Sequence, residues 1–231
     1  MLGIIGAMEE EVLKLREAMD VEETRVKAGM EYTKGTLMGA PVVVVRSGIG
    51  KVNAALCTQI LVDEFQVDAV INTGIAGSLQ AKIDIGDIVL STDVLQHDVD
   101  ATVFGYGYGQ IPRMDVLAFP ADAKMREVAQ ACCLEVNPEI GVFQGRVVSG
   151  DQFISDGEKK EWISQEFAGY CTEMEGAAIG QAAYLNGVPF LIIRAISDKA
   201  DNSASMDYPT FEAQAIEHTV KLVKAFVSRW R

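Results

Sequence analysis

Short apolar runs recur along the chain and alternate with longer amphipathic segments. Apolar runs bounded by turn residues are typical of strands buried on both faces, and the longer segments have the spacing of helices. Strands are predicted at residues 2–5, 69–71, 86–91, 141–149 and 190–193, with two more between 30 and 46 on either side of a turn at 39–41. Helices are predicted at residues 9–19, 52–65, 121–134, 158–167, 176–187 and 210–227. This alternation predicts one α/β domain over residues 1–231.

The helix predicted from Gly176 has an unusual composition. Its apolar positions are mostly alanine, and such small side chains let a helix axis lie close to a sheet. Gly187 and Pro189 end the helix, because glycine favours the C-terminal cap and proline cannot continue a helix. The apolar strand at 190–193 follows at once.

Charged and polar residues come directly after this strand. Arg194, Ser197 and Asp198 interrupt what would otherwise be a continuous apolar run. In open α/β sheets, ligands bind at the carboxyl ends of the strands, so Asp198 is expected to meet Glu175 at this edge. A structural interpretation stays open, because Glu173 and Glu175 also suit the positive end of a helix dipole, and Asp198 suits a helix cap.

Other predicted strands end in a similar way. Glu11 follows the first strand, although three glutamates in a first helical turn also fit a dipole role. Glycine-containing turns follow at 47–51, 72–78 and 150–154, and glycine lets the backbone approach a ligand closely. Plain tight turns explain them as well. Neither a phosphate-binding loop nor a dinucleotide fingerprint is matched.

Composition narrows the class of ligand. The net charge of −13 argues against nucleic acids and anionic membranes, because proteins bind both largely through lysine and arginine. A small molecule is therefore the expected ligand. The four cysteines lack metal-ligand spacing, which predicts no metal site. No secretory or membrane segment is recognised, which predicts a cytoplasmic protein. With only two histidines, carboxylates are expected to carry any proton transfer near neutral pH.

Residues 100–120 lose regular periodicity and contain several aromatic side chains, among them Phe104, Tyr106 and Tyr108. A long loop of this kind is usually functional. It is expected to form a lid or a contact with a partner.

Six motifs stand in order along the whole chain. They are Gly6-Ala7-Met8-Glu9-Glu10-Glu11, Ser47-Gly48-Ile49-Gly50-Lys51, Asn72-Thr73-Gly74, Val148-Ser149-Gly150-Asp151, Glu173-Met174-Glu175 and Arg194-Ala195-Ile196-Ser197-Asp198. Together they closely resemble the bacterial 5′-methylthioadenosine/S-adenosylhomocysteine nucleosidases. The resemblance implies a single-domain, three-layer α/β/α fold of the nucleoside phosphorylase type, with a central mixed twisted sheet. It also implies a homodimer that acts on adenine nucleosides without a metal or an organic cofactor.

The resemblance also assigns roles to individual positions. The water-activating base falls on Glu11, the leaving-group acid on Asp198 and the carboxylate for the ribose diol on Glu175. The other substrate-binding positions are Met8, Ile49, Gly77, Phe153, Ile154, Met174, Arg194, Ser197 and Tyr208. Of these, Phe153 would stack on the purine, the backbone of Ile154 would contact the edge of the base and Met174 would pack on the sugar. Phe104 and Pro112 resemble residues that each subunit donates to the alkylthio pocket of its neighbour.

Two positions depart from the family pattern. Ile75 stands where many members have a serine near the ribose, and Tyr208 stands where a phenylalanine often closes the 5′ pocket. The preference among 5′-methylthioadenosine, S-adenosylhomocysteine and 5′-deoxyadenosine therefore stays open. The segment 96–100 also resembles members that cleave aminodeoxyfutalosine, a related adenine nucleoside.

The predicted chemistry has an independent physical basis. Cleavage of an N-glycosidic bond builds positive charge on the sugar, which clustered carboxylates stabilise while a protonated one neutralises the departing base. A phosphorolytic relative would need an anion site with several arginines, and Arg46 and Arg194 are the only arginines at predicted strand ends. A non-catalytic nucleoside-binding protein has no need for both Glu11 and Asp198. Hydrolysis is therefore the favoured function.

Overall fold

The computed structural model describes residues 1–201 and 204–230. Within these ranges, ten strands form one mixed sheet in the order β10-β6-β8-β9-β5-β1-β4-β3-β2, with β7 paired to β6. The strands are β1 Leu2–Gly6, β2 Asp20–Lys27, β3 Met30–Leu37, β4 Ala40–Arg46, β5 Ala69–Ser78, β6 Ile88–Gln96, β7 Phe119–Pro120, β8 Val142–Ser149, β9 Cys171–Glu173 and β10 Phe190–Asp198.

Part of the sheet closes on itself. Strand β10 pairs with both β5 and β6, β6 pairs with β8, and β9 joins β8 to β5, so these five strands form a ring. Strands β4, β1, β5 and β10 lie side by side in this order and run parallel to one another. Their carboxyl ends therefore open at the same edge, which is where parallel sheets bind ligands.

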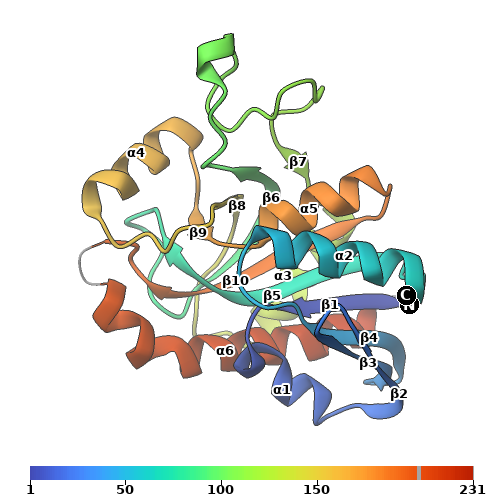
Figure 1. Cartoon of the computed structure of the whole chain (residues 1–231). Helices are drawn as coiled ribbons and strands as arrows, with labels where there is room; N and C mark the ends of the chain where they lie inside the picture. The colour runs from blue at the N-terminus through green and yellow to red at the C-terminus, as the bar shows by residue number, and fades with distance from the viewer. Residues whose placement is uncertain (202–203, 231) are drawn as a thin grey trace.

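Helices cover the sheet on two sides (Figure 1). They are α1 Glu9–Arg16, α2 Lys51–Phe65, α3 Ala123–Val136, α4 Gly157–Phe167, α5 Gly176–Leu185 and α6 Ala204–Arg229, and a short 3₁₀ turn covers Thr102–Phe104. Helix α2 packs beside α5, whereas α6 lies against β5 and β10 and contacts α1 and α3. The predicted α/β fold with a central mixed sheet between helices is confirmed. No helix among the described residues is long and apolar enough to cross a membrane.

The small side chains of α5 allow the close packing that their composition predicted. A Cβ atom at Gly180 would lie 2.4 Å from Val94 Cγ2 and 2.8 Å from Phe190 Cζ. A larger residue would push α5 away from β6 and β10. Because Glu175 immediately precedes this helix, its position depends on that fit.

Three strands are longer than the apolar runs predicted. Strand β5 continues from Ile71 to Ser78, β6 reaches Gln96 and β10 reaches Asp198, so the predicted ends at 71, 91 and 193 were wrong. Strands β5 and β10 stay paired through their polar halves, from Phe190 opposite Val70 to Asp198 opposite Gly77. Within these halves Asn72, Arg194 and Asp198 are buried and hydrogen-bonded to other groups of the site.

Two more boundaries were missed. The sequence of β2 shows no alternation of apolar and polar residues, and none of its residues is buried. It forms as an edge strand because it pairs with β3. Helix α6 begins at Ala204 rather than at 210. The intervening residues include Pro209, which usually indicates a helix boundary.

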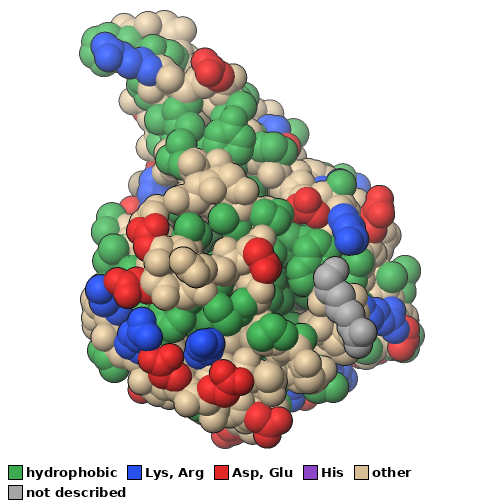
Figure 2. All heavy atoms as spheres, turned by 90° about the vertical axis from the view of Figure 1, so that its right-hand side faces the viewer, with side chains coloured by type: hydrophobic (Ala, Val, Ile, Leu, Met, Phe, Trp, Pro, Cys, Tyr) green, Lys and Arg blue, Asp and Glu red, His purple; other side chains and the backbone are tan. Residues whose placement is uncertain are grey.

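The segment between β6 and β7 projects from the body of the molecule (Figures 1 and 2). Apart from the short 3₁₀ turn it is irregular, as predicted. Phe104 at the end of that turn is 80% exposed.

Candidate active site

A cavity of about 360 Å³ opens at the carboxyl ends of β1, β5 and β10. Its walls also come from the start of α1, the turn before α2, the segment after β8 and the first part of α6. Among the positions predicted to bind substrate or to catalyse, the cavity is lined by Met8, Glu11, Ile49, Gly77, Phe153, Met174, Glu175, Arg194, Ser197, Asp198 and Tyr208. The structure thus brings together residues that lie up to 200 positions apart in the sequence.

Glu11 lies at one end of this cavity and is buried. Its Oε2 accepts hydrogen bonds from the N–H groups of Ala7 (2.6 Å) and Met8 (3.0 Å), and Oε1 accepts one from Ile75 (3.2 Å). Burial raises the pKa of Glu11, and the nearby Arg194 guanidinium and the three N–H groups act in the opposite direction. A raised pKa makes a carboxylate a stronger proton acceptor, which suits a general base.

Gly74 makes room for this arrangement. A Cβ atom there would lie 2.2 Å from Arg194 Nη1 and 2.4 Å from Glu11 Oε1. The glycine that the sequence offered as a simple turn residue is therefore needed inside β5, where Glu11 and Arg194 pass over the backbone.

Arg194 is a fully buried cation that holds several acidic side chains in place. It donates hydrogen bonds to Glu173 and to Asn72, and its Nη2 lies 3.6 Å from Glu175 Oε2. Buried charges persist only with partners, and Arg194 has them on neighbouring segments. This arrangement places the guanidinium beneath the cavity as a fixed positive charge.

Glu173 is a residue of the site that sequence reasoning did not include among the functional positions. Its carboxylate pairs with Arg194, accepts the N–H groups of Glu175 (3.1 Å) and Gly176 (2.7 Å), and also accepts the Ser149 hydroxyl. Glu173 therefore positions both Arg194 and the backbone that carries Glu175. The need of a buried arginine for a carboxylate partner was the signal that could have identified it.

Glu175 lines the same cavity, and the N–H of Gly50 donates to its Oε1 at 3.0 Å. Burial raises the pKa of Glu175 to about 7, and the neighbouring Glu173 adds to this effect. Arg194 and the Gly50 N–H lower the pKa again. The charge of Glu175 near neutral pH is thus set by a small number of contacts.

Asp198 lies at the other end of the cavity. Its Oδ2 accepts the Ser197 hydroxyl (2.8 Å), and its Oδ1 accepts the N–H of Ala200 (2.7 Å). A Cβ atom at Gly77 would lie 2.8 Å from Asp198 Oδ1, so glycine is required opposite this carboxylate. Phe153 lines the same cavity and is 51% exposed.

Ile154 is the one predicted position of the same subunit that does not line the main cavity. It lies beside a small hollow of about 30 Å³, whose walls include Phe153, Met174 and Asp198. Its side chain is buried. The prediction concerned the backbone of Ile154, which follows Phe153 at this edge of the site.

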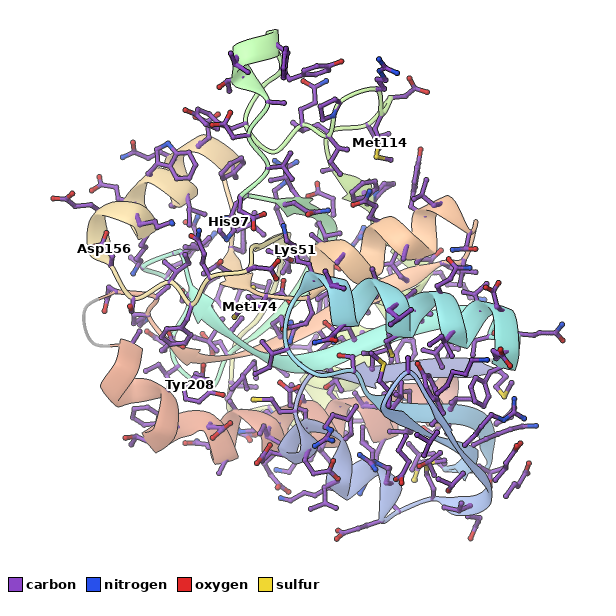
Figure 3. The ribbon with its side chains drawn as sticks, viewed as in Figure 1. Lys51, His97, Met114, Asp156, Met174 and Tyr208 are labelled. Carbon is purple, nitrogen blue, oxygen red and sulfur yellow. The ribbon has the colours of Figure 1, made fainter. Side chains whose placement is uncertain are left out.

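Tyr208 on α6 closes the cavity from a third side. Its hydroxyl lies within hydrogen-bonding distance of two acceptors, Met8 Sδ (3.3 Å) and Glu212 Oε1 (3.0 Å). Its ring meets Phe153 edge-on at 5.9 Å between centroids. Figure 3 shows Tyr208 and Met174 on neighbouring parts of the ribbon. The hydroxyl adds a polar group to a wall that is otherwise formed by methionine, isoleucine and phenylalanine.

Phe104 and Pro112 do not line the cavity of their own chain. Both are exposed on the projecting segment. Their predicted role in a neighbouring subunit stays a prediction. Within the described residues, no cluster of three or more histidine, cysteine or acidic side chains has the geometry of a metal site.

The chain matches the model of the phosphorylase superfamily over residues 1–228. It is 42% identical over 229 residues to the 5′-methylthioadenosine/S-adenosylhomocysteine nucleosidase of Bacillus pumilus, covering 99% of this chain and 98% of the relative.

Solved structures agree with this match. The Neisseria meningitidis 5′-methylthioadenosine/S-adenosylhomocysteine nucleosidase, crystallised with methylthio-immucillin-A, has a TM-score of 0.94 at 38% identity and covers 98% of both chains. The futalosine hydrolase of Helicobacter pylori has a TM-score of 0.92 at 32% identity, over 98% of this chain and 96% of the other. Sequence, fold and cavity together show that the chain belongs to the phosphorylase superfamily and, within it, to the 5′-methylthioadenosine/S-adenosylhomocysteine nucleosidases.

Proposed function

We propose that this chain, acting as a single catalytic domain, hydrolyses the N-glycosidic bond of 5′-methylthioadenosine and S-adenosylhomocysteine and releases adenine. The observation that carries the proposal is the pair of buried carboxylates, Glu11 and Asp198, which line one cavity together with Glu175. Gly74 and Gly77, the glycines beside Glu11 and Asp198, are three residues apart on β5, which corresponds to roughly 10 Å of strand. A ribose and a purine fit between groups at this spacing.

In the proposed reaction, Glu11 accepts a proton from a water molecule as the water oxygen bonds to the anomeric carbon. The bond from that carbon to the purine breaks, and Asp198 delivers a proton to a ring nitrogen of the departing adenine. Glu175 accepts hydrogen bonds from both ribose hydroxyls, which are charge-assisted and orient the sugar. The carboxylates also stabilise the positive charge that develops on the ring. Each proton transfer contributes about 10²- to 10⁴-fold to the rate.

Water is favoured over phosphate as the nucleophile. Arg194 is the sole arginine among the described residues that line the cavity, and it is already engaged by Glu173 and Asn72. Arg46 lies outside this cavity, and its Nε is 3.8 Å from Glu9. A phosphate ion would therefore find no unpaired guanidinium beside the sugar.

The choice of nucleoside is the main alternative within this proposal. Similarity to a futalosine hydrolase supports aminodeoxyfutalosine as a second candidate substrate, with a role in menaquinone synthesis. Activity on methylthioadenosine would instead serve methionine salvage in the cytoplasm. Both reactions release adenine from a ribose, and they differ in the 5′ substituent.

The test is chromatography of products after incubation with each nucleoside, with and without phosphate. We expect adenine and a free ribose derivative at a rate that phosphate does not change. A strict phosphate requirement with a sugar 1-phosphate as product would contradict hydrolysis. If the protein cleaved aminodeoxyfutalosine much faster than methylthioadenosine, aminodeoxyfutalosine would be the preferred substrate.

We also propose a homodimer in which Phe104 and Pro112 reach the cavity of the partner. Phe104 is largely exposed, and exposed apolar groups on a projecting segment indicate an interaction site. Sedimentation at the assay concentration checks this proposal. A monomer that is fully active at nanomolar concentration would contradict the proposal that two subunits share each pocket.

A further inference from the structure

Three segments that are distant in the sequence meet on the outer side of the wall that carries Glu175. They are the start of α2, the residues after β6 and the turn after β8. Lys51 Nζ lies 2.6 Å from Asp98 Oδ1 and 3.0 Å from Gln96 Oε1. The side chains of Lys51 and Asp98 are each only 18% exposed, so solvent screens this ion pair less than a surface pair.

The turn after β8 is bound to both of the other segments. Asp98 Oδ2 accepts the N–H of Asp151 (3.0 Å), and Asp151 Oδ1 accepts the N–H of Lys51 (2.8 Å). The contacts form a closed circuit: from the Lys51 side chain to Asp98, on to Asp151, and back to the Lys51 backbone. Moving any one of the three segments breaks at least two of these contacts.

The next residue along the chain connects this circuit with the cavity. The N–H of Gly50, adjacent to Lys51, is the group that donates to Glu175. Gly50 has φ +97°, and a Cβ atom there would lie 3.2 Å from Asp151 Oδ1, so glycine is required. Two consecutive N–H groups at the start of α2 therefore bind two carboxylates, Asp151 on the outside and Glu175 on the inside. Helix N-termini favour such anionic partners.

We propose that the Lys51–Asp98 ion pair is a positioning element for the reaction, because it holds the Gly50 N–H on Glu175 and so orients this carboxylate for the ribose diol. The inference rests on the proposed function. Neither Lys51 nor Asp98 lines the main cavity, so both act through Gly50 and Asp151. Asp98 also lies at the start of the projecting segment, two residues after the end of β6, and its contacts therefore fix the base of that segment as well.

The groups that face Glu175 set the expected direction of a pH effect. Glu173 and Glu11 raise its pKa, whereas Arg194 and the Gly50 N–H lower it. Loss of the Gly50 contact removes a lowering effect, so the pKa of Glu175 moves above about 7. The ionised fraction then falls at neutral pH, and the acid limb of kcat/KM moves to higher pH.

The test compares Lys51→Met and Asp98→Asn with Lys51→Arg and the wild type. We expect kcat/KM at pH 7 to fall about tenfold or more in the first two variants, because small displacements of catalytic groups have effects of this size. Their acid limbs should move to higher pH, and Lys51→Arg should restore most of both losses. Lys27→Met is the control, since it removes a Lys–Glu pair of the same length, 2.6 Å, between Lys27 on β2 and Glu64 near the end of α2.

Lys51→Met and Asp98→Asn together distinguish a positioning effect from a direct electrostatic effect on the pKa of Glu175. Loss of the Lys51 cation would by itself raise the pKa of Glu175, but loss of the Asp98 anion would by itself lower it. If positioning is the cause, both variants move the acid limb upward. An opposite shift in Asp98→Asn, or unchanged profiles in both, would overturn the proposal.

Two further measurements distinguish a loss of positioning from a loss of the dimer or of the fold. Sedimentation and thermal unfolding of each variant show whether a loss comes from dissociation or misfolding, and Lys51→Arg still tests the proposal if Lys51→Met is unstable. If the wild type itself releases no adenine, the proposed function fails. An active wild type with variants that match the Lys27→Met control in rate and pH profile would refute the positioning role alone.

Discussion

The two ends of the cavity hold their carboxylates in different ways. At the Glu11 end, the carboxylate accepts N–H groups from a turn and a strand, and the buried Arg194 lies close by. At the Asp198 end, one oxygen accepts a backbone N–H and the other a hydroxyl, that of Ser197. The N–H donors around Glu11 are fixed by the backbone. At Asp198, by contrast, the Ser197 hydroxyl can rotate.

This difference bears on which carboxylate can give up a proton and which can take one. A backbone N–H is always a donor, so the N–H groups around Glu11 favour the ionised form that a base requires, against the effect of burial on its pKa. A hydroxyl can donate to an ionised Asp198 or accept from a protonated one. The Asp198 end therefore tolerates both protonation states, as an acid requires. Paired carboxylates in contrasting environments are a recurring way to divide acid and base roles.

The largest effect is expected for Glu11→Gln. The amide removes the base and also brings an NH₂ group toward N–H donors of Ala7 and Met8, so the variant loses both charge and fit. We expect kcat/KM to fall by about 10³-fold, within the usual range for a lost general base. The loss should be equal for methylthioadenosine and for a nucleoside with an activated leaving group.

Glu10→Gln is the matched control for this variant, because Glu10 is exposed on the same helix turn. Steady-state kinetics with both substrates make the comparison. A Glu11→Gln enzyme that keeps more than a tenth of its activity would show that water is activated elsewhere.

Asp198→Asn is expected to have the next largest effect, and it separates the two ends of the cavity. Adenine leaves poorly as an anion, so loss of its proton donor should lower kcat by about two orders of magnitude. An activated nucleoside, whose leaving group needs no proton, should lose far less. Inhibitor binding by calorimetry checks that the variant still recognises the ligand. Equal losses with both substrates would assign Asp198 an organising role.

Much of this site could be predicted from the ends of apolar runs. Glu11, Glu175 and Asp198 each follow or flank a predicted strand or helix boundary, and the parallel strands of an α/β sheet bring such boundaries to one edge. The motifs then identified the family. Local sequence was sufficient here because each position depends on the strand or helix that carries it.

The parts that were missed depend on contacts between distant segments. The polar halves of β5 and β10 remain strands because they pair with each other, and the end of β5 also pairs with β9. No local periodicity encodes this pairing. Glu173 looks like a helix-terminal acid until Arg194, 21 positions later, is seen to pair with it. The Lys51–Asp98 pair, 47 positions apart, is of the same kind. Side chains that act through other residues carry little signal in a single sequence.

The smallest effect concerns Phe153→Ala, which tests whether the Asp198 end is also the purine end. Phe153 is half exposed in the cavity wall and meets Tyr208 edge-on, so one face of its ring is available for stacking. Stacking of a base on an aromatic ring contributes about 1–3 kcal/mol. We therefore expect the affinity for free adenine, measured as product inhibition, to fall about tenfold, with a smaller change in kcat. Glu175→Gln serves as the contrast, because it removes a proposed ribose contact and should leave adenine inhibition unchanged. If the two variants weakened adenine equally, the base would not be confined to the Asp198 end, and the division of the cavity into a water end and a purine end would be wrong.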